Sequence, residues 1–247
     1  MKDKTDVIYL ENVNKYYGKK KVLYNINLSI PKGCIFGLLG PSGCGKTTTV
    51  KIIAGILKKD SGKVVVLDQK MPDLDIMADI GYMAQSAALY KDLSAYDNLK
   101  FFGSLYKLKK DELENRIEYV AKLTDLQNDL NKKVVAFSGG MKQRLSLAVA
   151  LIANPKVLIL DEPTVGIDPV LRKNIWEELY KLSDSGVSIL VTTHVMDEAL
   201  KCDKLAMMRE GKILAVGTPQ EIQDRANTSN LEDAFIYFGK LGDSDED

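Results

Sequence analysis

The sequence is poor in the residues from which disulfide-stabilised and zinc-binding proteins are built. Its 247 residues include three cysteines, Cys34, Cys44 and Cys202, and a single histidine, His194. The cysteines are odd in number, form no Cys-x-x-Cys pair and have no histidines at metal-ligand spacing. This pattern excludes a disulfide framework and a Cys/His zinc site, and it predicts a reduced cytosolic protein with free thiols.

Long hydrophobic runs are also missing. The most apolar tract covers residues 145–160, and Asn154, Pro155 and Lys156 break it well short of the ~20 residues that a membrane span needs. The first ten residues, MKDKTDVIYL, carry charges with no apolar run behind them. We therefore expect neither a signal segment nor a helix that crosses a membrane.

Neither sign of charge is in excess. The chain has 34 basic and 34 acidic residues, which argues against a protein that binds nucleic acid through its overall charge, so no nucleic-acid partner is expected. Hydrophobic residues make up 45% and charged residues 28%, as in an average globular domain.

Short apolar runs alternate with longer helical patterns. Residues 34–40, 156–160 and 188–193 are continuous apolar runs of the kind that form buried parallel strands. Helical patterns cover residues 46–57 and 168–186. Such alternation predicts an α/β domain with a mostly parallel sheet.

Two other parts of the chain follow different patterns. Residues 7–18, 21–33 and 62–69 predict short strands of an antiparallel sheet. Between residues 88 and 133 the pattern is helical and charged, and we expect a small helical subdomain rather than part of the core. Its apolar positions include Leu113, Ile117, Val120 and Leu123. The acidic end, GDSDED, is predicted to be disordered.

The loop GPSGCGKT, residues 40–47, matches GxxxxGK[ST] and follows a predicted buried strand directly. Gly40, Gly43 and Gly45 let backbone N–H groups turn inward around phosphates, at the start of a helix. Lys46 is placed to reach the β and γ phosphates, and the hydroxyl of Thr47 to hold Mg²⁺.

Carboxylates and the histidine follow two further strands. Asp161 and Glu162 end the run KVLIL, at the strand end where α/β sheets bind ligands. We expect Asp161 to hold Mg²⁺ through a water and Glu162 to polarise an attacking water as general base. His194 follows SILVTT and is expected to donate a hydrogen bond to the γ-phosphate.

The stretch FSGGMKQR, residues 137–144, predicts a second anion-binding helix start. Ser138 stands at the cap position, and Leu145, Val149 and Ile152 form an apolar face. One phosphate loop leaves some γ-phosphate oxygens exposed, so a second chain could bring its Ser138 loop over them.

Together these motifs resemble the ATP-binding cassette (ABC) ATPases over about residues 7–225. GPSGCGKTT resembles the Walker A loop, GYMAQ the Q-loop with Gln85, FSGGMKQ the signature and VLILDE Walker B. VGID resembles the D-loop with Asp168, and His194 the switch histidine. NKYYGKKKVL resembles the loop that stacks on adenine, with Tyr17 at the usual place and Tyr16 as the alternative.

The resemblance implies a P-loop NTPase core with an antiparallel β-subdomain and an inserted helical subdomain at residues 88–153. Residues 226–247 then form a C-terminal helix and acidic tail. The resemblance also implies ATP and Mg²⁺ as ligands. The catalytic residues that it implies are Lys46, Gln85, Glu162 and His194. The metal-site residues are Thr47, Gln85 and Asp161. The nucleotide contacts are Tyr17, Val22, Gly40, Pro41, Ser42, Gly43, Cys44, Gly45, Lys46, Thr47, Thr48, Gln85, Ser138, Gly139, Gly140 and Asp168.

The family resemblance also implies partners. We expect a head-to-tail dimer, most simply of two identical cassettes, that drives transport through separate membrane subunits on the cytoplasmic side of the membrane. The run 140–169 is similar to cassettes of exporters. An ABC ATPase of cofactor assembly and a nucleotide-binding regulator that does not turn over ATP are the alternatives.

The sequence departs from the family pattern at two places. Phe137 and Met141 stand where the signature consensus LSGGQ has Leu and Gln, and Pro169 follows the D-loop sequence GID. Neither signature change alters Ser138, Gly139 or Gly140, the residues expected to meet phosphate.

Overall fold

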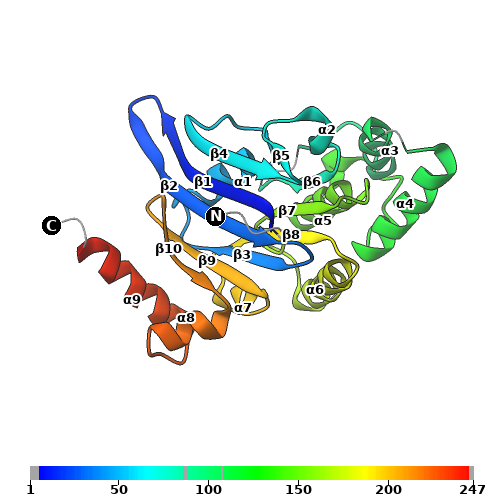
Figure 1. The fold of residues 1–247 in the computed structure, drawn as a ribbon. Coiled ribbons are helices and arrows are strands. Elements are labelled where there is room, and N and C mark those ends of the chain that lie inside the picture. The colour runs from blue at the N-terminus through cyan, green and yellow to red at the C-terminus, as the bar shows by residue number, and fades with distance from the viewer. Residues whose placement is uncertain (1–5, 86–87, 107, 245–247) are drawn as a thin grey trace.

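The computed structural model describes residues 6–85, 88–106 and 108–244. A six-stranded sheet lies at its centre, in the order β10-β9-β3-β8-β7-β6, and a four-stranded sheet in the order β2-β1-β4-β5 lies above it (Figure 1). The fold is the predicted α/β class, with a mostly parallel central sheet and an antiparallel N-terminal sheet.

Five strands of the central sheet are parallel to their neighbours, and only the pair β9 and β10 is antiparallel. The strands are β3 (Ile35–Leu39), β6 (Ile80–Met83), β7 (Val157–Asp161), β8 (Ser188–Thr193), β9 (Lys204–Arg209) and β10 (Lys212–Gly217). Every residue of β3, β7 and β8 is buried, as the continuous apolar runs predict.

The antiparallel sheet consists of β1 (Asp6–Tyr17), β2 (Lys20–Pro31), β4 (Ser61–Val66) and β5 (Gln69–Lys70). Helix α1 (Lys46–Ile53) lies between the two sheets. One apolar cluster joins them, with Ile8 and Leu10 of β1, Val50 of α1 and Phe36 and Ile159 of the central sheet. This layer holds the loop before α1 against both sheets.

Two helices, α5 (Gly139–Leu151) and α6 (Pro169–Asp184), pack against the opposite face of the central sheet. Helices α3 (Ala95–Leu105) and α4 (Lys110–Leu123) pack against α5, and the short 3₁₀ turn η1 (Val134–Ala136) precedes it. Leu158 and Val191 of the sheet belong to the same apolar cluster as Leu99 of α3, Ile117 of α4 and Leu145 of α5. The helical segment predicted for residues 88–133 is therefore present, and its buried side chains join one apolar cluster with the central sheet.

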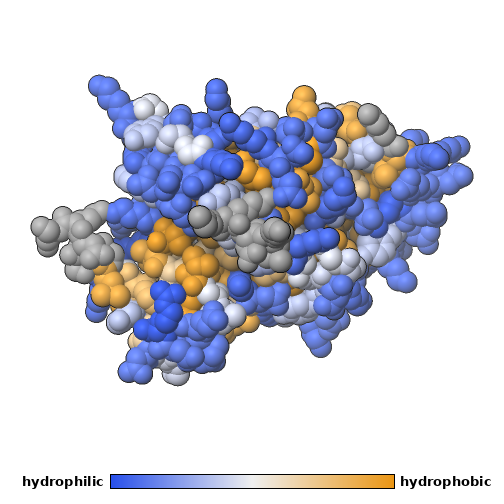
Figure 2. Space-filling view, in the orientation of Figure 1, coloured by the Kyte–Doolittle hydropathy of each residue, from blue (hydrophilic) through white to orange (hydrophobic). Residues whose placement is uncertain are grey.

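The C-terminal segment forms a third layer. Short helices α7 (Met196–Ala199) and α8 (Pro219–Arg225) precede α9 (Leu231–Ser244), which packs through Ala234 and Phe238 against β9 and β10. Figure 2 shows apolar side chains gathered at the lower left, over β10 and α9, where Val216 and Ile236 are exposed. Because α9 reaches Ser244, the first three residues of GDSDED are helical and not disordered, while residues 245–247 lie outside the described part.

Helix α2 (Leu74–Met77) completes the elements. Within the described ranges no helix has the length and apolar character required to cross a bilayer. The sequence AALYKDLSAYDNLKFF, residues 87–102, is an apolar stretch expected to offer a groove to a partner helix. Its first residue, Ala87, lies outside the described residues, and α3 starts after Ser94, whose hydroxyl accepts a hydrogen bond from the Asp97 N–H.

Candidate functional site

Three parallel strands bring the predicted site together at one edge of the central sheet. The phosphate loop follows β3, Asp161 ends β7 with Glu162 directly after it, and His194 follows β8. The register places Leu39 beside Thr193 and Asp161 beside Thr192. Carboxyl ends of parallel strands meet at the same sheet edge, so segments more than a hundred residues apart converge there.

The phosphate loop is tightly packed at its start. A Cβ added to Gly40 would lie 2.1 Å from the Met208 carbonyl oxygen, so a side chain does not fit there. Gly45 caps α1 with φ +113°, a conformation that favours glycine. Lys46 is 4% exposed and its Nζ donates to the carbonyl oxygens of Gly40 (2.7 Å) and Pro41 (3.0 Å). The ammonium group thus lies inside the loop, as an anion site requires.

A turn from the other end of the chain supports this loop. Gly211, between β9 and β10, donates its N–H to the Cys44 carbonyl oxygen (2.9 Å) and accepts from the Tyr24 N–H (2.8 Å). It has φ +77°, and a Cβ there would lie 2.2 Å from the Val22 carbonyl oxygen. Gly211 therefore bridges β2 of the antiparallel sheet and the phosphate loop.

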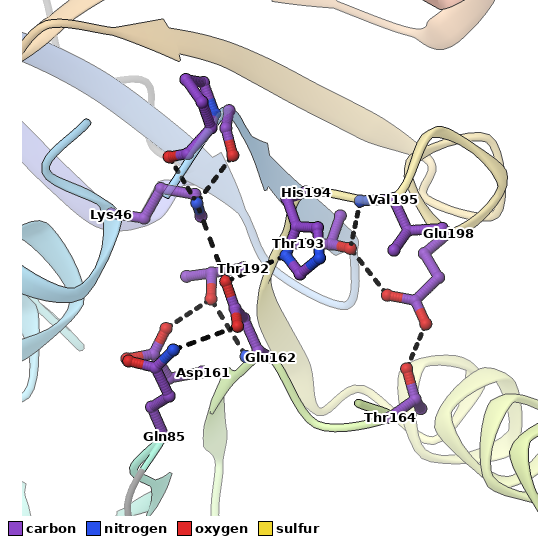
Figure 3. Close-up of polar contacts among 12 residues, drawn as sticks. Lys46, Gln85, Asp161, Glu162, Thr164, Thr192, Thr193, His194, Val195 and Glu198 are labelled. Carbon is purple, nitrogen blue, oxygen red and sulfur yellow. Dashed lines mark hydrogen bonds and ion pairs between the residues drawn. The ribbon is translucent and has the colours of Figure 1, made fainter. Parts of the chain in front are cut away.

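Glu162 is the meeting point of the four predicted catalytic residues (Figure 3). Its Oε2 accepts from Gln85 Nε2 at 3.1 Å, while its Oε1 lies 3.2 Å from His194 Nδ1. Lys46 Nζ is 3.9 Å from the same Oε1. The carboxylate is thereby held at the end of β7 with its orientation defined by side chains from three other segments.

Asp161 provides the oxygen that a metal ion needs. It is fully buried, and its Oδ1 accepts from Thr192 Oγ1 at 2.5 Å. Its Oδ2 is also buried and has no hydrogen-bond partner among the described residues. Burial and the nearby charge of Asp161 raise the pKa of Tyr82 to about 12. An unpartnered buried carboxylate oxygen fits a magnesium site, since hard cations prefer oxygen ligands.

Thr47, the second predicted metal ligand, is half-buried at the start of α1. Gln85, the third, directs its amide nitrogen to Glu162. The Asp161 carboxylate, the Thr47 hydroxyl and the Gln85 amide oxygen are all chemically suited to Mg²⁺, and their role as its ligands stays a prediction.

The signature loop has the predicted helix cap. Ser138 is exposed and its Oγ accepts from the Met141 N–H at 3.2 Å, at the start of α5. Gly139 is exposed, and a Cβ built there would meet no atom within 4 Å. Phe137 is buried and Met141 packs on the same apolar cluster, so the two departures from the family signature face the core.

The apolar face predicted for α5 was too narrow. Leu145 and Ile152 are buried and Val149 is half-buried, but Leu147 and Ala148 are buried as well. The helix is enclosed on more than one side because it lies between the sheet and the other helices.

Several predicted contact residues lie away from the Glu162 cluster. Tyr16 and Tyr17 are both exposed at the end of β1, each with a lysine ammonium over its ring. Asp168 is exposed and caps α6 by accepting from the Leu171 N–H (3.0 Å). Within the described part of the chain, the contacts of these side chains do not join them to Glu162. The nucleotide roles of these residues stay predictions.

Three threonines and a glutamate that support the site were not predicted from the sequence. Thr192 Oγ1 bonds Asp161 and also accepts from the Glu162 N–H at 3.1 Å. Glu198 is 4% exposed, and its carboxylate accepts from the hydroxyls of Thr193 and Thr164. The available signal was two threonines at the end of an otherwise apolar strand, with a carboxylate four residues after His194.

Comparison with known proteins places this arrangement in a family. The model of the family described as ABC transporter matches residues 23–165. ABC transporter G family member 20 of Dictyostelium discoideum is 43% identical over 94% of this chain, which spans 32% of that protein's length. The linearmycin resistance ATP-binding protein LnrL of Bacillus subtilis is 38% identical over 93% of this chain and 78% of its own length. A spermidine/putrescine import ATP-binding protein, PotA of a Nostoc species, is 38% identical over 92% of this chain and 60% of its own length.

Solved structures give the same result. A bacterial ABC transporter cassette solved as a dimer superimposes with a TM-score of 0.81 at 30% identity, over 85% of this chain and 98% of that one. The same cassette has been solved in a post-hydrolysis state bound to ADP and Pi. These matches confirm the fold and the ATPase class of domain predicted from the sequence. The chain belongs to the ABC transporter family.

Proposed function

We propose that this chain binds and hydrolyses Mg²⁺–ATP and that two copies, joined head to tail, drive export through separate membrane subunits. The observation that carries the proposal is the position of Glu162. Its carboxylate lies at a strand end beside a buried lysine, with Gln85 and His194 fixing its direction. A carboxylate held this way can accept a proton from an attacking water.

The phosphate end of the nucleotide is assigned to residues 40–48. Lys46 lies inside the loop and neutralises charge on the β and γ phosphates, and the start of α1 adds backbone N–H donors. Thr47, Gln85 and Asp161 would hold Mg²⁺, which would supply positive charge to the transferring phosphoryl group. His194, whose side chain is 43% exposed, donates to the γ-phosphate from the end of β8.

The dimer is assigned to the exposed Ser138 loop. Ser138 and Gly139 face solvent at the start of α5. Within the described residues, the Ser138 hydroxyl bonds to its own helix and not to the phosphate loop of the same chain. In a head-to-tail pair, each Ser138 loop covers the γ-phosphate held by the partner's Lys46. Because every motif of both half-sites is present in this chain, a homodimer is the simplest assembly.

The membrane contact is assigned to an aromatic cluster on α3 and the segment before it. Tyr90 and Phe101 are 49% and 38% exposed, and their ring centroids lie 4.9 Å apart in an edge-to-face arrangement. Phe102 packs against Phe101 at 5.4 Å. Such an apolar platform suits a helix of an integral membrane subunit, which would hold the chain at the cytoplasmic face of the membrane.

Export is proposed from the relative that confers linearmycin resistance, since removal of the compound is the direct way for a transporter to protect a cell. The relative named for spermidine/putrescine import works in the opposite direction, so import is the result that would contradict this proposal. Reconstitution in vesicles with the membrane subunits would separate the two by the side on which substrate accumulates.

The central experiment is Glu162→Gln. It keeps the size of the side chain and removes the base, so ATP binding persists, an ATP-bound dimer accumulates and hydrolysis slows by about 100-fold or more. Size-exclusion chromatography and a phosphate-release assay measure these two effects. Glu177→Gln, on the exposed side of α6, is the control and keeps the wild-type rate. Normal turnover of Glu162→Gln would contradict the general-base assignment.

A role in cofactor assembly is the second candidate, because this fold serves functions other than transport. Co-purification of the chain with an integral membrane protein supports transport. Its recovery with soluble assembly proteins alone would favour the alternative.

A further inference from the structure

Helix α5 makes a direct contact with the main chain of Glu162. The Nε2 of Gln143 donates a 2.9 Å hydrogen bond to the Glu162 carbonyl oxygen. Gln143 lies five residues after Ser138, on the helix that starts at the signature loop. The proposed base is therefore tied to the same rigid element that presents the signature loop.

The backbone of Glu162 requires such support. Glu162 has φ +54°, in the left-handed region that residues with a side chain rarely adopt. Its N–H is held on one side by Thr192, through the carbonyl oxygen (3.2 Å) and the hydroxyl (3.1 Å). Gln143 holds its carbonyl oxygen on the other side. The two contacts hold the peptide groups on either side of the Glu162 Cα, and the direction of the carboxylate depends on both.

A second contact joins the two segments near the signature loop. A Cβ added to Gly140 would lie 3.1 Å from the Gly166 carbonyl oxygen, so the first turn of α5 lies against the segment that follows Glu162. Because a helix moves as a unit, a shift of Ser138 toward a ligand carries Gln143 with it. Main-chain movement at Glu162 then follows from the hydrogen bond.

We propose that Gln143 is a positioning residue, which holds Glu162 in its catalytic direction and links it to the Ser138 loop of the same chain. The proposal rests on the proposed function. In the dimer, the Ser138 loop meets the nucleotide of the partner, while Glu162 serves the nucleotide of its own chain. Gln143 therefore makes the direction of each base sensitive to the nucleotide bound on the other side of the interface.

The test replaces Gln143 by methionine, which is of similar length and favours helix but lacks an N–H donor. We expect kcat for ATP hydrolysis to fall about 10- to 100-fold, because small displacements of a catalytic group are costly. KM and the Kd for a non-hydrolysable ATP analogue stay within about twofold, because the phosphate loop is unchanged.

Two further variants complete the experiment. Gln220→Met is the matched control, since Gln220 also donates through Nε2, to Asp224 on the exposed helix α8, and its kcat stays at the wild-type value. Gln143→Lys restores a donor and is expected to recover much of the lost kcat. Should Gln143→Met not fold, Gln143→Glu retains the side-chain length without the donor and takes its place.

A kcat of Gln143→Met within twofold of wild type overturns the inference. A parallel loss of analogue binding and thermal stability, with no recovery in Gln143→Lys, also overturns it, because that is the behaviour of a purely structural contact. Glu162→Gln is measured alongside. If that variant turns over normally, the proposed function fails; if it is inactive while Gln143→Met is normal, the positioning role alone fails.

Discussion

The hydroxyl of Thr193 donates a 2.7 Å hydrogen bond to the buried carboxylate of Glu198. The other oxygen of that carboxylate accepts from Thr164, and Thr193 Oγ1 also accepts from the Val195 N–H at 3.0 Å. Glu198 thus connects Thr193, the residue before His194, to Thr164, which follows Glu162 by two residues. These contacts hold the His194 and Glu162 segments in fixed positions relative to each other.

Replacing Glu198 by alanine should destabilise the fold. The change leaves the hydroxyls of Thr164 and Thr193 without their acceptor in a buried position, at a cost of about 2–4 kcal/mol. The free energy of unfolding, measured by urea denaturation, checks this value. Glu177→Ala is the control on exposed α6 and changes stability by less than about 0.5 kcal/mol. Equal stability of the two variants would show that the buried network contributes nothing.

Gly40→Ala should damage the phosphate loop itself. The new Cβ would lie 2.1 Å from the Met208 carbonyl oxygen and 2.8 Å from Cys44 Sγ, so the loop must move. We expect a loss of about 1–3 kcal/mol in stability together with weaker ATP binding. Gly139→Ala provides the comparison in thermal denaturation, because a Cβ there is free of contacts within 4 Å. Both variants melting at the wild-type temperature would contradict the predicted clash.

Ser138→Arg tests the shared site. The substitution places a bulky side chain at an exposed helix start, so one chain alone binds ATP normally while closure of the dimer is blocked. The rate of ATP hydrolysis per chain, measured over a range of protein concentrations, rises with concentration for the wild type and stays low for this variant. Ser185→Arg, at the exposed end of α6, is the control. Hydrolysis independent of concentration in the wild type would rule out a site made by two chains.

Alkaline pH should weaken the fold through Cys34. Burial, followed by the nearby charge of Asp203, raises the pKa of this thiol from 9.0 to about 11. The unfolded chain therefore releases the thiol proton first, and the free energy of unfolding falls as the pH rises from 9 to 11. Burial also raises the pKa of Cys44 and Cys202, so Cys34→Ala reduces this slope without abolishing it. An unchanged slope in Cys34→Ala would mean that Cys34 does not contribute.

Much of the site was predictable because its chemistry lies at strand ends. A buried strand followed by GPSGCGKT, and another followed by Asp161 and Glu162, predict that these segments lie at one edge of the sheet. His194 was placed by the same reasoning. Each of these predictions needed only the local pattern and the rule that parallel strands end at one edge.

The contacts that orient the site were not predictable in that way. Gln143 reaches Glu162 across 19 positions, and Thr192 reaches Asp161 across 31, so both depend on the packing of separate elements. Strand β6 was missed as well. It is four residues long, and its Gly81 lies so close to α5 that a Cβ would be 2.2 Å from the Ala150 carbonyl oxygen. Periodicity likewise predicted the apolar face of the helical segment, but not the sheet and helices that cover it.

The bridge at Gly211 has a mechanical consequence. Since its two backbone hydrogen bonds join β2 to the phosphate loop, the antiparallel sheet and that loop are expected to move as one rigid body. A nucleotide bound by both would have its base and its phosphates held by one rigid unit. Any opening or closing of the nucleotide site would then be a movement of helices α3, α4 and α5 relative to this rigid unit. A membrane subunit bound to these helices would move with them.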